Sequence, residues 1–98
     1  DIADLFLDPE GLFALVRNAD AVVRVEFGQD GFRELEAWSF AEVTNDPAYR
    51  DANVTFGKAE GLCMDADRVY VILDNNGHGR EVDALDTRPL LFIFARPR

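Results

Sequence analysis

Apolar and polar residues alternate over most of the first forty residues, and turns rich in Gly and Asp interrupt the alternation. An alternation of period two predicts β-strands, here at 2–7, 12–16, 21–27 and 32–40. The intervening turns have four residues each, a length that joins neighbouring antiparallel strands. Residues 1–40 therefore predict one antiparallel unit of four strands.

The second half of the chain predicts a similar but smaller unit. A polar connection, 41–58, is too long for an ordinary turn, which suggests a functional loop or one covered by a partner. Two apolar runs at 62–64 and 69–73 then flank a polar turn rich in Asp, and 90–95 is apolar on both faces, as in a strand buried inside a sheet stack. Residues 59–98 therefore predict three antiparallel strands, with the outermost strand of the unit missing.

A hairpin recurs in both units. Residues 5–18 align without a gap on residues 62–75 after a shift of 57 positions (62 minus 5), apolar on apolar and turn on turn. Asp8 falls on Asp65 and Asn18 on Asn75. Self-similarity at a fixed spacing is typical of repeat architectures. The pattern thus favours one structural unit used twice.

Taken together, the units predict an all-β fold made of about two blades of a β-propeller, with six blades expected in the whole ring. Two blades cannot close a ring, so the remaining blades are expected from the same or another chain. The strand near Ile2–Leu7, or its outer neighbour, and the strand Leu90–Ala95 would otherwise leave open sheet edges. We expect another polypeptide segment to cover them.

Composition narrows the function classes. The chain of 98 residues has a formal net charge of −9 and a pI near 4.4, which argues against nucleic acid as a partner, because phosphates would be repelled. No apolar stretch is long enough for a membrane span. Cys63, the single cysteine, excludes an intrachain disulfide and is expected to act as a small apolar strand residue. The compartment stays open, with the periplasm and secretion as the options considered, and a signal peptide would lie outside this chain.

The open end of the second hairpin gathers polar residues. The four-residue turn predicts that Met64 opposes Val69. The same register places Glu60 opposite Leu73 and beside Asp74. The residues expected to meet there are Glu60, Asp74, Asn75 and Asn76.

These residues suggest two kinds of chemistry. Glu60, Asp74 and Asn76 are candidate ligands of a divalent cation, with calcium as the expected cofactor, because calcium prefers carboxylate and amide oxygens. Glu60, Asp74 and His78 are the candidate general acids or bases. Each residue also has a structural alternative. Glu60 could form an ion pair with Lys58 or Arg88, and Asp74 could close a turn with its own side chain. His78, which lies between two glycines, could simply be exposed.

The open ends of the two hairpins are expected to form one rim of the molecule. A small polar ligand is the other expected partner of this rim. Arg17, Asn18, Asn75 and Arg88 are the candidate ligand-binding residues, since arginine binds phosphate and carboxylate through charge-assisted hydrogen bonds. The alternative for both arginines is a solvated surface position.

Three segments, Lys58–Leu62, Val69–Asn76 and Arg88–Phe94, resemble the last blade of phytase-like β-propellers, the domains described as "esterase-like activity of phytase". Asp4–Gly11 resembles the penultimate blade of the same family. The resemblance implies that the chain forms the C-terminal blades of such a propeller. The sequence Glu-Gly-Leu followed by Asp-Asn after the next strand is also similar to gluconolactonase-like propellers, which hold a divalent cation with Glu, Asn and Asp.

The resemblance implies a metal-assisted hydrolase of phosphate or carboxylate esters, in which the metal polarises the substrate and activates water. The alternative is a non-catalytic propeller scaffold that binds a ligand or a protein partner on its rim. A third hypothesis is an interaction module whose exposed strands complete the propeller of another chain. Whether the chain is an enzyme stays open, because one fold supports many functions.

Overall fold

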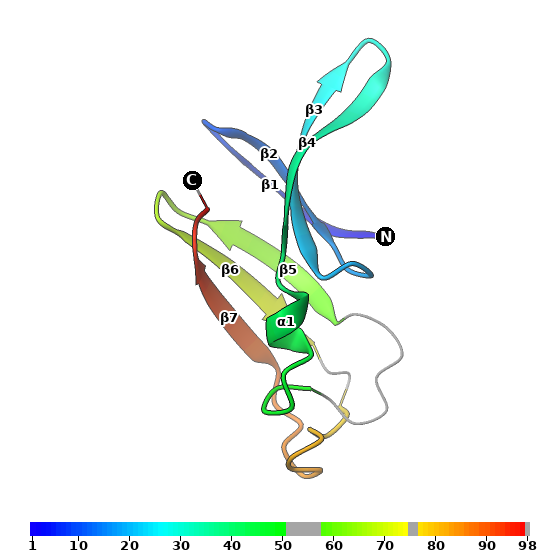
Figure 1. Ribbon diagram of the computed structural model, residues 1–98, viewed down its shortest axis with the longest axis vertical. Coiled ribbons are helices and arrows are strands. Elements are labelled where there is room, and N and C mark those ends of the chain that lie inside the picture. Colours follow the sequence, from blue (N-terminus) through cyan, green and yellow to red (C-terminus); the bar gives the residue numbers. More distant parts are fainter. Residues whose placement is uncertain (51–57, 75–76, 98) are drawn as a thin grey trace.

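The computed structural model describes residues 1–50, 58–74 and 77–97. Within them, seven strands form two antiparallel sheets, ordered β1-β2-β3-β4 and β5-β6-β7 (Figure 1). The elements are β1 Ile2–Asp8, β2 Gly11–Val16, β3 Ala21–Gly28, β4 Gly31–Ser39, helix α1 Ala41–Thr44, β5 Ala59–Met64, β6 Arg68–Leu73 and β7 Leu90–Ala95. The expected all-β class, with one antiparallel sheet of four strands and one of three, is confirmed.

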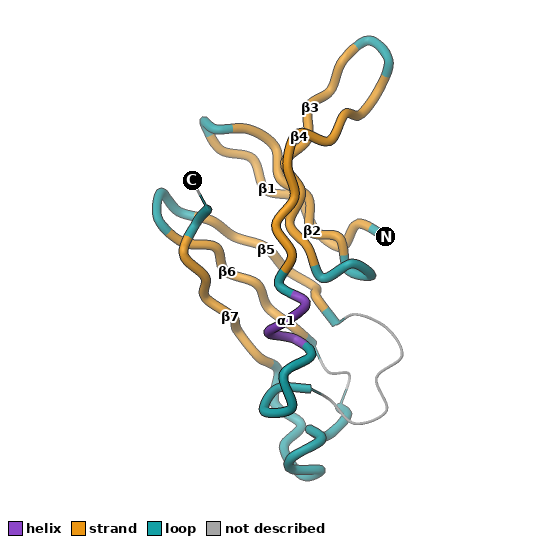
Figure 2. The backbone as a smooth tube through the Cα atoms, viewed as in Figure 1, coloured by secondary structure: helices purple, strands orange, loops and turns teal. Residues whose placement is uncertain are grey.

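Turn residues define where the hairpin strands begin and end. The Asp8 carboxylate accepts a hydrogen bond from the Glu10 amide at 2.9 Å and closes the β1–β2 turn. Gly31 enters β4 with a φ of +97°, a conformation that glycine adopts without steric cost. The β3–β4 hairpin projects beyond the rest of the molecule (Figure 2), where Phe27 and Phe32 stack with ring centroids 4.2 Å apart.

The connection between the sheets begins with a single helical turn. In α1, the Thr44 hydroxyl donates a hydrogen bond to the Asp20 carboxylate at 3.0 Å, which ties the helix to the turn before β3. Among the described residues, no helix has the length and apolar character needed to cross a membrane. Residues 51–57 of the predicted 41–58 connection lie outside the described ranges.

The two inner hairpins, β1–β2 and β5–β6, share one hydrogen-bonding framework. Their registers superimpose after the shift of 57 residues, including an irregularity at the first strand, between Ile2 and Asp4 in one and between Ala59 and Gly61 in the other. The backbone bond from the Arg17 amide to the Asp1 carbonyl is repeated by Asp74 and Lys58, each at 3.0 Å. The hairpins are therefore equivalent in register as well as in sequence.

The predicted pairing of Met64 with Val69 is confirmed, but the predicted pairing of Glu60 with Leu73 is wrong. Ala59 opposes Leu73, because the register shifts by one residue between Ala59 and Gly61. A β-bulge of this kind adds one unpaired residue and re-aims its side chain. Glu60 is that extra residue.

The sheets stack so that opposite faces of equivalent strands meet. In the first sheet, we call the face that carries Leu5, Leu7 and Leu12 the front face. In the second sheet, the front face carries the equivalent residues, Leu62, Met64 and Val69. The opposite face of each sheet is the rear face. The core cluster joins the rear face of the first sheet to the front face of the second, and β1 lies beside β5 (Figures 1 and 2). Its buried members are Phe13, Leu15, Val22, Phe40, Ala59, Leu62, Met64, Val69, Val71, Leu73 and Phe92.

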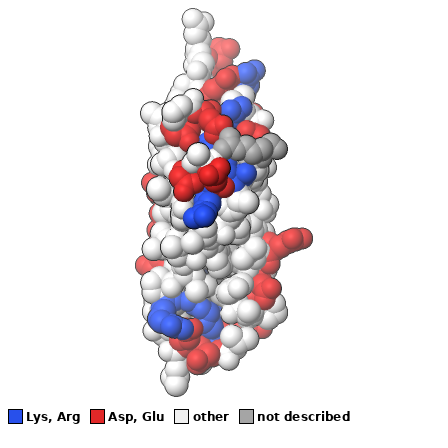
Figure 3. All heavy atoms as spheres, turned by 90° about the vertical axis from the view of Figure 1, so that its left-hand side faces the viewer, with Lys and Arg blue, Asp and Glu red and all other residues white. Residues whose placement is uncertain are grey.

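β7 departs from the expectation of a strand buried on both faces. Phe92 is buried in the core, whereas Leu91 and Ile93 are exposed on the rear face of the second sheet. The expectation of a strand buried on both sides is therefore wrong for this chain, since only one layer covers the strand. On the side of the molecule that lies at the left in Figure 1, an uncharged band separates two clusters of charged residues (Figure 3).

β1 and β4 are the edges of the first sheet, and β5 and β7 are the edges of the second; β1 lies beside β5, so β4 and β7 are the edges away from the contact between the sheets. β4 carries several charged side chains, which discourage edge-to-edge pairing, whereas β7 carries none between Leu90 and Ala95. Between the two strands lies a cavity of about 250 Å³, lined by Trp38, Phe40 and Phe94 among others. Coverage of these edges by another segment remains a prediction.

Candidate functional site

The rim at the open ends of both hairpins brings two predicted residues together. Arg17, just after β2, approaches Glu60 on β5 with its Nη2 atom 3.2 Å from the carboxylate. The Nε atom of Arg17 also lies 3.7 Å from the Asp1 carboxylate. Glu60 therefore takes the structural option of an ion pair, although with Arg17 and not with the expected Lys58 or Arg88.

The other predicted rim residues are placed as follows. Asp74 and His78 are exposed, and the Asp74 amide is bonded to the Lys58 carbonyl at 3.0 Å. Asn18 is exposed in the turn before β3. Asn75 and Asn76, also predicted for this rim, lie outside the described residues. No group of three or more His, Cys, Asp or Glu side chains suited to a metal occurs in the part of the chain that the structure describes.

Arg88 belongs to a separate loop cluster. Its Nε and Nη2 atoms donate to the Asp86 carboxylate at 2.9 and 3.1 Å. These charge-assisted bonds lower the pKa of Asp86 to about 2. In the same region Arg50 donates to Glu81 at 2.6 and 2.8 Å and holds the pKa of that carboxyl below its usual value. The Arg50–Glu81 pair joins the loop of residues 80–88 to the segment after α1, whereas the Arg88–Asp86 pair lies within the loop.

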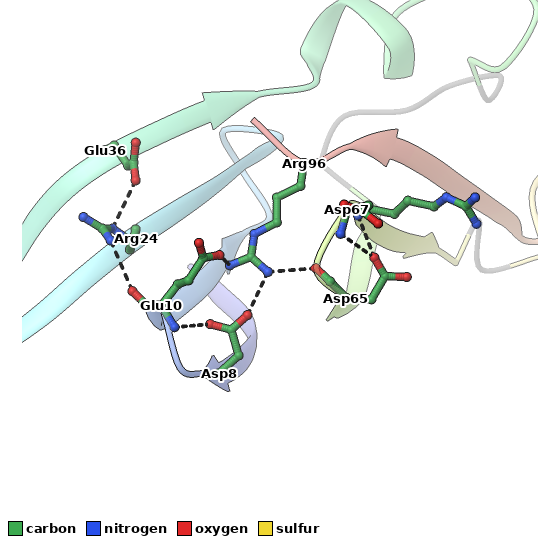
Figure 4. A network of polar contacts seen from close by, with 8 residues as sticks. Asp8, Glu10, Arg24, Glu36, Asp65, Asp67 and Arg96 are labelled. Atoms are coloured by element: carbon green, nitrogen blue, oxygen red, sulfur yellow. Dashed lines mark hydrogen bonds and ion pairs between the residues drawn. The ribbon is translucent and has the colours of Figure 1, made fainter. Parts of the chain in front are cut away.

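The sequence analysis missed a buried charge, Arg96, which lies directly after β7. Only 3% of its side chain is exposed. Its Nη1 atom donates to the Asp8 carboxylate at 2.7 Å and to the Asp65 carbonyl at 2.8 Å, and its Nη2 atom lies 2.5 Å from the Glu10 carboxylate (Figure 4). Arg96 thus connects the turns of both equivalent hairpins.

Local structure prepares both turns to receive this arginine. The Asp65 carboxylate accepts hydrogen bonds from the Asp67 and Arg68 amides at 2.8 and 2.7 Å, as Asp8 does from Glu10. These backbone bonds lower the pKa of Asp65, and the hydrogen bond from Arg96 lowers the pKa of Asp8. The coincidence of Asp8 with Asp65 in the aligned sequence was the signal that could have pointed to a shared partner.

Arg96 also packs over an aromatic ring. Its guanidinium carbon lies 5.1 Å from the ring centroid of Phe13, a cation–π distance, and Phe13 in turn lies 5.7 Å from Trp38. Arg24 extends the charged network, with Nη1 donating to the Glu10 carbonyl at 3.1 Å and Nε lying 3.1 Å from the Glu36 carboxylate (Figure 4). The positive charges are thereby matched by carboxylates at each step, which favours a structural linkage over an anion site.

A further carboxylate crosses between the sheets at the rim. Asp4 on β1 accepts a hydrogen bond from the Leu62 amide on β5 at 2.8 Å. At the equivalent position the second sheet has Gly61, where an added Cβ would lie 2.7 Å from the Ile72 side chain. The two hairpins are therefore alike in backbone but not in every side chain.

Fold and site together define an all-β protein of two stacked antiparallel sheets whose equivalent hairpins are joined by arginine–carboxylate contacts. No protein-family model matches the chain, and neither curated proteins nor solved structures include a significant match.

Proposed function

We propose that the chain serves as a non-catalytic scaffold: two consecutive blades of a propeller of the phytase-like kind, which binds partners through its sheet faces and rim. The observation that carries this proposal is the head-to-tail stacking, in which the rear face of one sheet covers the front face of its equivalent. A contact between non-identical faces can be repeated, and it closes a ring when the rotation per unit allows. If two identical faces were in contact, that contact would be used up in a pair of units and no further unit could be added through it.

The charges on the rim agree with a scaffold. Arg17 and Glu60 neutralise each other and hold the two hairpins together, and Arg88 is paired with Asp86 within its own loop. The shared register and bulge of the two inner hairpins support the proposal that they are equivalent units of one repeat.

Cys63 provides a test of the scaffold proposal because it is exposed on the rear face of the second sheet. In the protein isolated from its natural source, another unit should cover this face, so we expect Cys63 to react with an aromatic disulfide reagent only after unfolding. The 98-residue chain at high dilution should react at once. Rapid labelling of the native natural protein would show that the rear face is bare, and the scaffold proposal would fail.

The ester hydrolase implied by the resemblance is a second candidate. One observation favours it: Asp1 and Glu60 both approach Arg17, so two carboxylates share the rim, and a cation could replace the guanidinium between them. Calcium would then be held by Glu60 with Asp74 as a further ligand, and it would supply a polarising charge for ester cleavage; Asn76, the third expected ligand, lies outside the described residues.

On this second candidate, calcium should stabilise the folded chain by about 2.7 kcal/mol at a hundredfold excess over Kd. The measurement is the melting temperature with calcium and with chelator, for the wild type and Glu60→Gln. Glu42→Gln, which removes an exposed carboxylate from α1, is the matched control and should keep the full shift. An equal melting temperature of the wild type in both conditions would eliminate the metal.

A further inference from the structure

The β1 part of the front face of the first sheet is exposed, although its equivalent in the second sheet is buried; farther along this face, Ala14 and Val23 are buried. Leu7 is 74% exposed, whereas its equivalent, Met64, is 5% exposed beneath the first sheet. Ile2 and Leu5 are likewise exposed, while their equivalents, Ala59 and Leu62, belong to the core. Large apolar side chains that have a buried counterpart in the same register mark a surface built for contact.

The rear face of the second sheet shows the converse. Leu91 is 57% exposed, whereas Val22, which occupies the same place in the first sheet, is 2% exposed. Ile72 is also exposed, and its equivalent, Leu15, is fully buried. The two free faces are thus the counterparts of the two faces that already pack against each other within the chain.

We propose that this chain binds a second copy of itself head to tail, with the front face of one copy's first sheet on the rear face of the other copy's second sheet. The proposal rests on the head-to-tail repeat described above and names its partner. Because the contact is between different faces, it can be repeated. Two to four copies would supply the roughly four to eight blades of a typical propeller.

Differences between the two units set the strength of this contact. Within the chain, Asp4 adds a hydrogen bond to the Leu62 amide, but the rear face of the second sheet has Gly61 in the place of Asp4. The contact between copies therefore lacks that bond and should be weaker and reversible on dilution. The net charge of −9 per chain opposes association, so added salt should strengthen it by screening.

Three single substitutions to arginine test the proposal, all at exposed positions that the fold does not need. Leu7→Arg blocks the front face, Leu91→Arg blocks the rear face, and Leu85→Arg alters an exposed loop leucine as the matched control. Circular dichroism should be unchanged in all three. Should either face variant fail to fold, Leu5→Arg and Ile72→Arg replace them.

Sedimentation velocity over a range of concentrations then gives the decisive comparison. The wild type and Leu85→Arg should associate, and each face variant alone should remain a monomer. An equimolar mixture of the two face variants should form a species of twice the monomer mass, because each retains the face that the other has lost. The blocked faces should stop growth at that dimer.

Other outcomes overturn the proposal. A wild type that stays monomeric at every concentration and salt level excludes self-association, and association of one face variant at the wild-type level indicates a contact between identical faces. A mixture that remains monomeric excludes the head-to-tail arrangement. Failure of self-association would not contradict the scaffold proposal, because further units of the same polypeptide could cover Cys63 in the natural protein. The labelling of Cys63 and the sedimentation experiment therefore test the two proposals separately.

Discussion

Phe13→Ala should lower the free energy of unfolding by about 4 kcal/mol, within the range measured for Phe removed from a core. Phe13 is 1% exposed and belongs to the core cluster between the sheets. Its removal opens a cavity and also ends the ring contacts with Trp38 and with the Arg96 guanidinium. A loss of this size is a large share of the roughly 5–15 kcal/mol that stabilises a typical domain.

Phe32→Ala is the matched control, because Phe32 is 54% exposed on the projecting hairpin and contacts Phe27 there. We expect its cost to be under about 1 kcal/mol, since little buried area is lost. Urea unfolding followed by circular dichroism measures both variants. Similar losses for Phe13→Ala and Phe32→Ala would show that the contact between the sheets is not the main source of stability.

The strands could be predicted from the sequence because each is specified locally. Alternation of apolar residues, and four-residue turns containing Asp or Gly, are sufficient to define hairpins such as β1–β2 and β5–β6. The common register of these hairpins also followed from the aligned positions of Asp8 and Asp65. All the residues that specify such a hairpin lie within the hairpin itself.

The bulge and the exposure of β7 could not be predicted in the same way. A one-residue irregularity at Glu60 leaves the apolar pattern intact, so nothing in the sequence distinguishes the pairing of Leu73 with Ala59 from its pairing with Glu60. The apolar run of β7 signals burial on both faces, but whether a second layer exists depends on other units and not on Leu91 or Ile93.

Only part of the candidate site could be predicted, because its contacts join residues of different sheets. Arg17 and Glu60 were both placed on the rim, but their ion pair depends on how β5 packs beside β1, a distance set by the stacking of the sheets. Arg96 was missed entirely, because its partners Asp8 and Asp65 are far away in the chain and meet only when both sheets are in place. Contacts between layers carry no periodicity that a sequence pattern could reveal.

Arg96→Met should lower the free energy of unfolding by about 3 kcal/mol at neutral pH. Methionine keeps much of the apolar stem but removes every donor, so the carboxylates of Asp8 and Glu10 lose their shared counter-ion and the Asp65 carbonyl loses a hydrogen bond. The loss is expected near the lower end of the range for broken buried ion pairs, because the Glu10 side chain remains partly in solvent.

The matched control is Arg33→Met, which removes an exposed arginine from an ion pair with Glu26 on the projecting hairpin. Exposed pairs of this kind contribute little, so its unfolding curve should overlap that of the wild type. Chemical unfolding at neutral pH compares the three proteins. Equal stability of Arg96→Met and Arg33→Met would contradict the role of Arg96 as the link between the two hairpin turns.

Acid provides a second and independent measurement of the same link. The hydrogen bond from Arg96 holds the pKa of Asp8 below its unfolded value of about 3.9, so the unfolded chain binds more protons in this range. The stability contributed by Asp8 is therefore fully present above about pH 4 and is lost as the pH falls through the lowered pKa. Arg96→Met removes the cause of the shift, so its stability should fall less steeply than that of the wild type between pH 4 and pH 2, whereas Arg33→Met should follow the wild type. Parallel acid profiles for Arg96→Met and the wild type would mean that Asp8 owes its low pKa to the backbone of its own turn.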